Sequence, residues 1–290
     1  MRVVDLRIDV PLFFAAVMGK NTTRTGAVAV ALGSKPCKGI WGLNGVKVPG
    51  SVEVDSYNSE DGPYSVVTAG DDGDVCSGKD IVVSGKTIIN GDVMPGFGYA
   101  TTTNGGALEI TGTTTVSNQG VTAPVVTVDE AMLSNDNDTI TLTDKGNDPF
   151  SSGLNMSLTA NDNLTLQPGL YYFESMSFTS GASLTITGPT EIYLSGDLNV
   201  TGTGTINTTL NPADLTIYST GSTVKMTGDV EFYGSIIAPY AEIELAGTSS
   251  YYGAIIGGTV KISGDFEFHV DESLDDVFAL IKPPPPTLVQ

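Results

Sequence analysis

A short motif recurs along most of the chain and restricts the folds open to it. In each copy two apolar residues flank one polar residue, and a small residue and a glycine follow. Alternation of this kind buries one side of a strand, and glycine allows the tight corner that ends it. The motif therefore predicts a mostly β protein built from short strands. Its copies end at Gly85, Gly112, Gly188, Gly196, Gly202, Gly228, Gly247 and Gly264.

The spacing and uniformity of the copies favour a β-solenoid, a fold like a parallel β-helix. The last three glycines are 19 and 17 residues apart, a spacing typical of one solenoid turn whose apolar side is buried only against neighbouring turns. The alternative is an antiparallel sandwich or barrel, which also uses short strands and glycine turns. Hairpin signals such as Asn44-Gly45 and Asn90-Gly91 occur only in the first half, so the solenoid is the preferred prediction for residues 165–270.

Four segments are expected along the chain. Residues 1–77 form a small α/β segment and a polar, turn-rich region: a strand over residues 4–10, a short helix over 12–18, and then a second helix or strand. Residues 78–164 form an irregular β region. Residues 165–282 form the solenoid, and residues 274–282 form a short helical cap on its open end. Residues 283–290 form a proline-rich tail.

Charge excludes several classes of partner. The chain has 13 Lys and Arg against 33 Asp and Glu, a net charge of −20. Such a surface repels phosphates, so nucleic acid and anionic membranes are not expected as partners. With one histidine and two cysteines, a thiolate zinc site is excluded, and so is a Ser-His-Asp triad built away from residue 269.

The composition is typical of an exported protein, and the two cysteines bear on the same question. The chain is acidic, rich in Gly, Thr and Asn and poor in Lys, although its start shows no export signal. Either an export element or membrane anchor lies upstream of this sequence, which is the preferred prediction, or the protein is cytoplasmic. Cys37 and Cys76 form a disulfide if the compartment is oxidising, and otherwise they are two unrelated buried thiols.

Two groups of residues are candidates for a site. His269, with Asp271 and Glu272, could serve as a general base. It could instead tie the cap to the last solenoid turn by bonding to Asp271, Glu272 or a nearby carbonyl, and this structural role is preferred. The run Asp71, Asp72 and Asp74 is an acidic loop that lacks the fixed glycine and distal glutamate of a calcium-binding EF-hand. No catalytic residue, metal ligand or cofactor is predicted, and Asp136 and Asp138 are likewise taken as solvated.

The chain resembles the β-rich domains of bacterial Tad-type (TadE/TadG-like) pilus-assembly proteins and PilX-like surface proteins. The resemblance is carried by residues 266–274 (FEFHVDESL), 234–241 (GSIIAPYA), 252–257 (YGAIIG), 54–64, 89–93 and 4–19. It implies a non-enzymatic, extracytoplasmic structural protein whose partners are other pilus or envelope proteins. The family implies no catalytic residues.

A second part of the chain resembles bacterial ice-binding-like β-solenoids. Residues 166–173 (LQPGLYYF) and 184–188 (LTITG) are similar to the entry of those solenoids, although the long helix packed beside them is not visible here. This resemblance implies a surface binding module for ice or glycans as the alternative function. A carbohydrate-active solenoid enzyme is a third hypothesis.

Overall fold

The computed structural model describes residues 2–11, 22–31, 37–117, 120–140, 150, 153–160 and 162–281, and only the backbone of the first two segments. The chain divides into two units, residues 1–35 and 36–290. In the first unit, β1 (Arg2–Pro11) pairs with β2 (Thr22–Ala31) as an antiparallel hairpin. The strand expected over residues 4–10 is confirmed, and the second element is a strand. The helix expected over residues 12–18 lies outside the described residues.

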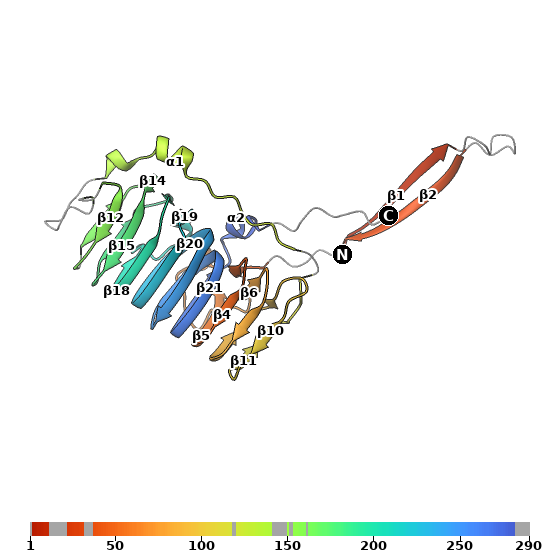
Figure 1. Cartoon of the computed structure of the whole chain (residues 1–290), viewed down its shortest axis with the longest axis horizontal. Helices are drawn as coiled ribbons and strands as arrows, with labels where there is room; N and C mark the ends of the chain where they lie inside the picture. Colours follow the sequence, from red (N-terminus) through yellow and green to blue (C-terminus); the bar gives the residue numbers. More distant parts are fainter. Residues whose placement is uncertain are drawn as a thin grey trace. The chain divides into compact units, whose positions relative to one another are not determined.

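The second unit is a β-solenoid, as the recurring motif predicts. Its strands pair in parallel and in register from one coil to the next, on three faces (Figure 1). Face one holds β12 (Asn155–Leu158), β15 (Ser175–Thr179), β4 (Val46–Val48), β7 (Ile81–Val83) and β10 (Thr101–Thr103). Face two holds β13 (Asn163–Leu166), β16 (Ser183–Ile186), β5 (Ser51–Tyr57), β8 (Lys86–Ile89) and β11 (Ala107–Ile110). Face three holds β14 (Gly169–Phe173), β17 (Thr190–Leu194), β19 (Leu215–Ser219), β3 (Gly39–Gly42), β6 (Asp74–Ser77) and β9 (Val93–Met94).

Three longer strands turn the corners between faces. β18 (Leu198–Ile206) covers faces one and two, and β20 (Thr223–Gly247) and β21 (Ser250–Asp271) each contribute to all three faces. We number the coils along the stack: β12–β14 form the first coil, β15–β17 the second and β18–β19 the third. The fourth coil lies in β20, and the fifth runs from the end of β20 into the start of β21. These two strands are long because they continue through the corners.

The order of coils in space differs from their order in the sequence. Residues 259–271 of β21 form faces one and two of the sixth coil, and β3, from near the other end of the chain, supplies its third face. β4–β6 then form the seventh coil, β7–β9 the eighth, and β10 and β11 begin the ninth. The solenoid is thus made of two chain segments, residues 153–271 and 39–117, that meet at the sixth coil.

This arrangement corrects the expected domain boundaries. Residues 37–77 are part of the solenoid and not of a separate N-terminal segment, and most of residues 78–117 form regular coils. The polar, turn-rich composition that suggested otherwise belongs to the corners between very short strands. The segment from residue 120 to 140, with α1 (Asp129–Leu133) and the 3-10 helix η3 (Asn137–Thr139), runs along the stack toward β14 (Figure 1).

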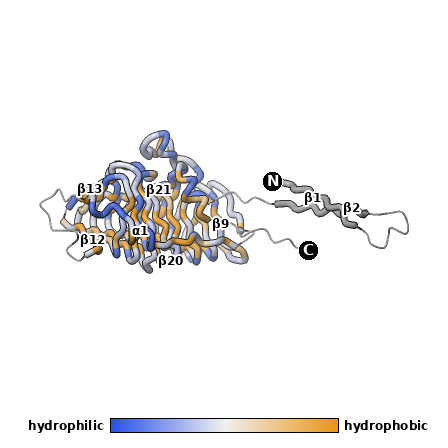
Figure 2. The backbone as a smooth tube through the Cα atoms, turned by 90° about the horizontal axis from the view of Figure 1, so that it is seen from above, coloured by the Kyte–Doolittle hydropathy of each residue, from blue (hydrophilic) through white to orange (hydrophobic). Residues whose placement is uncertain are grey.

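The core consists of side chains that stack on their equivalents in the next coil. Phe232, Tyr251 and Phe268 occupy the same place in three successive coils, with ring centroids 4.8 and 4.7 Å apart. All three are essentially inaccessible to solvent. Hydrophobic positions recur in this way from coil to coil along the whole stack (Figure 2), so each coil buries its apolar side against its neighbours.

One corner of every coil from the third to the ninth is a glycine. The column lies between faces one and two, and a Cβ on almost any member would run into the backbone of the glycine below it. Gly50 shows this most simply: a Cβ there would lie 2.5 Å from the backbone N and O of Gly264. The recurring motif supplies most of this column, whereas Gly112, Gly188 and Gly196 lie in other corners. The column contains Gly202, Gly228, Gly247, Gly264, Gly50, Gly85 and Gly106.

The helix expected near residue 274 is present, but its expected role as a cap is wrong. α2 (Asp275–Phe278) is a short helix with two aspartates in its first turn, and Val277 and Phe278 are buried. It does not cover an open end of the stack, because β3–β5 pair with the edge of β21. Residues 282–290, and with them the proline-rich tail, lie outside the described residues. Among the described helices none is long and apolar enough to cross a membrane.

Candidate functional site

His269 lies where the two chain segments meet, and its partner is Asp55. Nδ1 of His269 is 2.6 Å from Oδ1 of Asp55, across the pair formed by β21 and β5. Both residues are buried, with exposed fractions of 2% and 4%. Because a carboxylate only accepts hydrogen bonds, Nδ1 donates. The expectation that His269 binds Asp271 or Glu272 is wrong: Nδ1 binds its in-register neighbour Asp55, and the carboxylates of Asp271 and Glu272 accept from Ser59 and Ser56.

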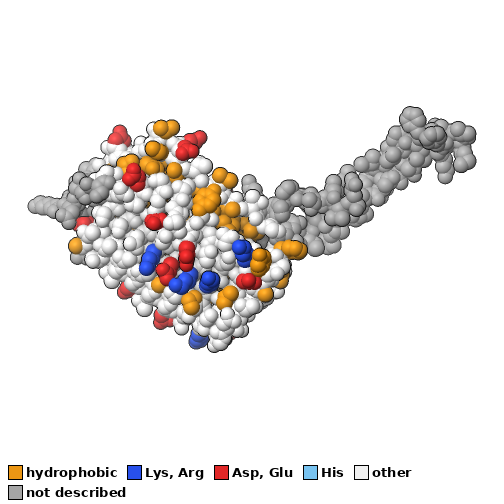
Figure 3. All heavy atoms as spheres, viewed as in Figure 1, with side chains coloured by type: hydrophobic (Ala, Val, Ile, Leu, Met, Phe, Trp, Pro, Cys, Tyr) orange, Lys and Arg blue, Asp and Glu red, His pale blue; other side chains and the backbone are white. Residues whose placement is uncertain are grey.

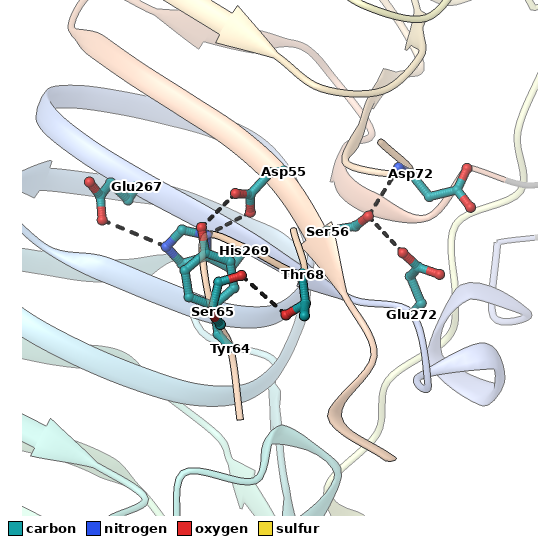
Figure 4. A network of polar contacts seen from close by, with 9 residues as sticks. All are labelled: Asp55, Ser56, Tyr64, Ser65, Thr68, Asp72, Glu267, His269 and Glu272. Atoms are coloured by element: carbon teal, nitrogen blue, oxygen red, sulfur yellow. Dashed lines mark hydrogen bonds and ion pairs between the residues drawn. The ribbon is translucent and has the colours of Figure 1, made fainter. Parts of the chain in front are cut away.

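Aromatic rings enclose the imidazole of His269. Tyr233, Tyr252 and His269 stack in successive coils, with centroids 4.3 and 4.7 Å apart. Tyr64, from the loop after β5, covers His269, with the two ring centroids 3.7 Å apart. The hydroxyl of Tyr64 donates to Oδ2 of Asp55 at 2.7 Å (Figure 4). Burial, and next the hydrogen bond with Asp55, raise the pKa of Tyr64. Tyr64 therefore stays a neutral donor at physiological pH.

The other ring nitrogen of His269 has no hydrogen bond within the described structure. Nε2 is buried, and the nearest carboxylate oxygen, on the exposed side chain of Glu267, is 3.7 Å away. A general base needs its free nitrogen within hydrogen-bond reach of a substrate proton. Here that nitrogen is buried, and Tyr64 and Tyr252 lie against the ring. The arrangement is suited to joining two coils.

Asp271 and Glu272 extend this joint along β5. Oδ1 of Asp271 accepts from the backbone N of Ser59 at 3.0 Å, and Oε1 of Glu272 accepts from the hydroxyl of Ser56 at 2.7 Å. The same Ser56 oxygen accepts from the backbone N of Asp72 at 3.0 Å (Figure 4). The structure thus brings His269, Asp271 and Glu272 to one boundary, the one between the sixth and seventh coils.

Sequence reasoning did not identify Asp55 and Tyr64. A signal was available, because residues 266–271 (FEFHVD) and 52–57 (VEVDSY) share their alternation and their glutamate. Placed one above the other, as β21 and β5 are, these segments put His269 opposite Asp55. Tyr64 carries no comparable signal, because it lies in a loop outside the repeat.

The interpretation of Asp71, Asp72 and Asp74 as a solvated loop fits Asp71, which is exposed, but is wrong for Asp74. Asp74 is fully buried, and its carboxylate accepts from the backbone N of Lys38 at 3.1 Å and of Asp92 at 2.8 Å. Asp138 is exposed as expected, but Asp136 is half-buried and accepts from the backbone N of Leu170 at 2.8 Å, which holds η3 on β14. Within the described residues no group of three or more His, Cys, Asp or Glu side chains is placed to bind a metal ion.

Cys37 and Cys76 form a disulfide. Their Cα atoms are 6.4 Å apart, and both side chains are buried. Cys37 precedes β3, which completes the sixth coil, and Cys76 lies on β6 of the seventh coil. The bond therefore crosses the same boundary as the pair of His269 and Asp55.

Comparison with known proteins places this chain in a family. The family model described as a domain of unknown function (DUF7305) matches residues 126–277, which is more than half of the 290-residue chain. The chain is a member of the DUF7305 family. The DUF7305 match runs from the connecting segment to α2 and includes β12–β21. Residues 39–117 lie outside it. They include β3, which completes the sixth coil.

Two solved structures have distant similarity to the chain. One is a glycosylated ice-binding protein (LeIBP) from an Arctic yeast, with a TM-score of 0.33 and 15% identity over 86% of this chain and 94% of that one. The other is the competence-associated pilin ComZ from Thermus thermophilus, with a TM-score of 0.32 and 11% identity over 85% of this chain and 72% of that one. No curated protein matches the sequence.

Proposed function

We propose that this DUF7305 protein is a non-enzymatic structural component of a bacterial surface or pilus assembly and that it works outside the cytoplasm. The observation that carries the proposal is the buried disulfide between Cys37 and Cys76, because disulfides persist in oxidising compartments. The resemblance of the sequence to Tad-type and PilX-like proteins supports the link to pili. In this proposal the chain is anchored to the membrane by a segment outside the sequence described here, and its partners are other envelope proteins.

The disulfide predicts a large change in stability. Replacing both cysteines by serine should lower the free energy of unfolding by roughly 3–4 kcal/mol, because the bond closes a loop of about forty residues in the unfolded chain. Urea denaturation of the double variant and of the oxidised protein measures this difference. Reduction of the wild-type protein is the matched control and should give the same loss.

Thiol titration tests the compartment directly. Protein isolated from the envelope of the source bacterium, denatured without reductant, should contain no free thiol. Two free thiols in that material would contradict an oxidising location.

To test the link to pili, surface-exposed protein is cross-linked on intact cells and its partners are identified. Recovery of pilus-assembly components supports the proposal, and recovery only of cytoplasmic proteins contradicts it.

A row of threonines favours a second candidate function, a surface module that binds ice or glycans. Thr179, Thr201 and Thr227 lie in register on neighbouring strands of face one, and all three are partly exposed. Their spacing is that of adjacent strands, about 4.8 Å. The row ends in the fifth coil, where Ala246 takes the equivalent position. An assay of ice recrystallisation with wild-type protein and Thr201→Tyr tests this candidate, and equal activity of the two proteins would reject the row as the binding surface.

A further inference from the structure

Faces one and two each present a column of outward side chains, one residue per coil. In each of the first eight coils the face-two residue follows the face-one residue by six positions. The in-register pairing of the strands aligns each column along the stack. Both columns therefore have the same spacing, about 4.8 Å per coil.

The two columns are chemically complementary in seven of the first eight coils. The first three coils carry small uncharged polar residues on both faces. In the fourth, sixth and seventh coils a lysine on face one accompanies a glutamate on face two, and in the eighth coil both residues are apolar. From the first coil to the eighth, the pairs are Ser157 and Asn163, Ser177 and Ser183, Asn199 and Thr205, Lys225 and Glu231, Glu244 and Ser250, Lys261 and Glu267, Lys47 and Glu53, and Val82 and Ile88.

Glu244 in the fifth coil breaks the pattern, and its ion pairs explain why. It is 2.7 Å from Nζ of Lys261 and 3.8 Å from Nζ of Lys225, so its charge is compensated on face one itself. Lys47 forms no ion pair in the described part of the chain and is exposed, as are Glu53 and Glu267. Figure 3 shows lysine and acidic side chains gathered over the middle coils of the face in view.

Face two also offers space beside these carboxylates. A shallow hollow of about 170 Å³ is lined by Glu53, Asp265 and Glu267 together with Lys86. Its size suits an extended lysine side chain, whose ammonium group would meet the carboxylates of Glu53 and Glu267.

We propose that face one of one molecule packs against face two of a second copy, with the coils of the two solenoids side by side and in register. Lys225, Lys261 and Lys47 then meet Glu231, Glu267 and Glu53 of the neighbouring copy. The contact joins two different faces, so it is heterologous, and repetition of it builds either a closed ring or an open row of molecules. This inference is independent of the proposed function. A cell-surface protein need not associate with itself, and a protein that does associate with itself need not belong to a pilus assembly.

Charge reversal at a single coil tests the contact without disturbing the fold. Lys47→Glu places a carboxylate beside Lys261, and Glu53→Lys places an ammonium group beside Glu267, so both changes are compatible with the neighbouring coils. Sedimentation of wild-type protein at about 0.15 M salt, where the net charge is screened beyond about 8 Å, should show concentration-dependent association. Each single variant should associate about tenfold or more weakly, because like charges then face each other.

Recombination of the variants gives the decisive result. A mixture of the two single variants should associate as the wild type does, and so should the double variant Lys47→Glu with Glu53→Lys. Lys79→Glu carries the same change in net charge as Lys47→Glu at an exposed site on neither column, and it should associate normally. Wild-type protein that stays monomeric, a double variant that stays weak, or equal weakening by Lys79→Glu would each overturn the proposal.

Discussion

Gly50→Ala should lower the free energy of unfolding by about 3 kcal/mol, a typical loss when atoms are forced into packed structure. The new Cβ would lie 2.5 Å from the backbone N and O of Gly264 and 2.8 Å from the carbonyl carbon of Ser263. These are backbone atoms of the neighbouring coil, so no side chain can move aside. Gly50 does not have a positive φ angle, and the loss therefore measures the close approach alone. For a domain of this size it corresponds to a fall in Tm of roughly 6–12 °C.

The matched control is Gly120→Ala. A Cβ on Gly120 meets nothing within 4 Å among the described residues. Its stability should be unchanged or slightly raised, because alanine restricts the unfolded chain. Similar melting temperatures for the two variants would show that the glycine corners do not stack as described.

His269→Ala should cost about 3 kcal/mol, because it leaves the buried carboxylate of Asp55 with one hydrogen bond fewer. The exposed Glu267 provides the control, since Glu267→Gln keeps its size and should change the melting temperature little. A double-mutant cycle with Asp55→Ala isolates the pair, and the two single losses should not add. Additive losses, or a His269→Ala protein that melts as the wild type does, would reject the role of this pair in joining the coils.

The sequence predicted the solenoid because its signal is local. The alternation before Gly228, Gly247 and Gly264 determines which side chains point inward and where the chain turns, and the structure confirms both. The order of coils has no such signal. Every coil offers a similar edge for the next one. The sequence of β21 therefore does not show whether its edge is covered by β3–β5 or by a helical cap.

The same reason explains what was missed at the joint. His269 was identified because it is the one histidine of the chain, but its partner, Asp55, is 214 positions away. Only the superposition of FEFHVD on VEVDSY relates the two residues. Tyr64 covers them from a loop whose conformation depends on the assembled coils, and no periodicity leads to it.

The sixth coil, made from both ends of the solenoid sequence, has a consequence for how the chain folds. β3 and β5 emerge early in synthesis, yet the edge on which they pair is completed only when residue 271 has been made. Contacts between residues so far apart require closure of a long loop and slow the search for the native state. We therefore expect the coils of residues 39–117 to dock last, after translation of the whole domain, so that the chain remains incompletely folded until then.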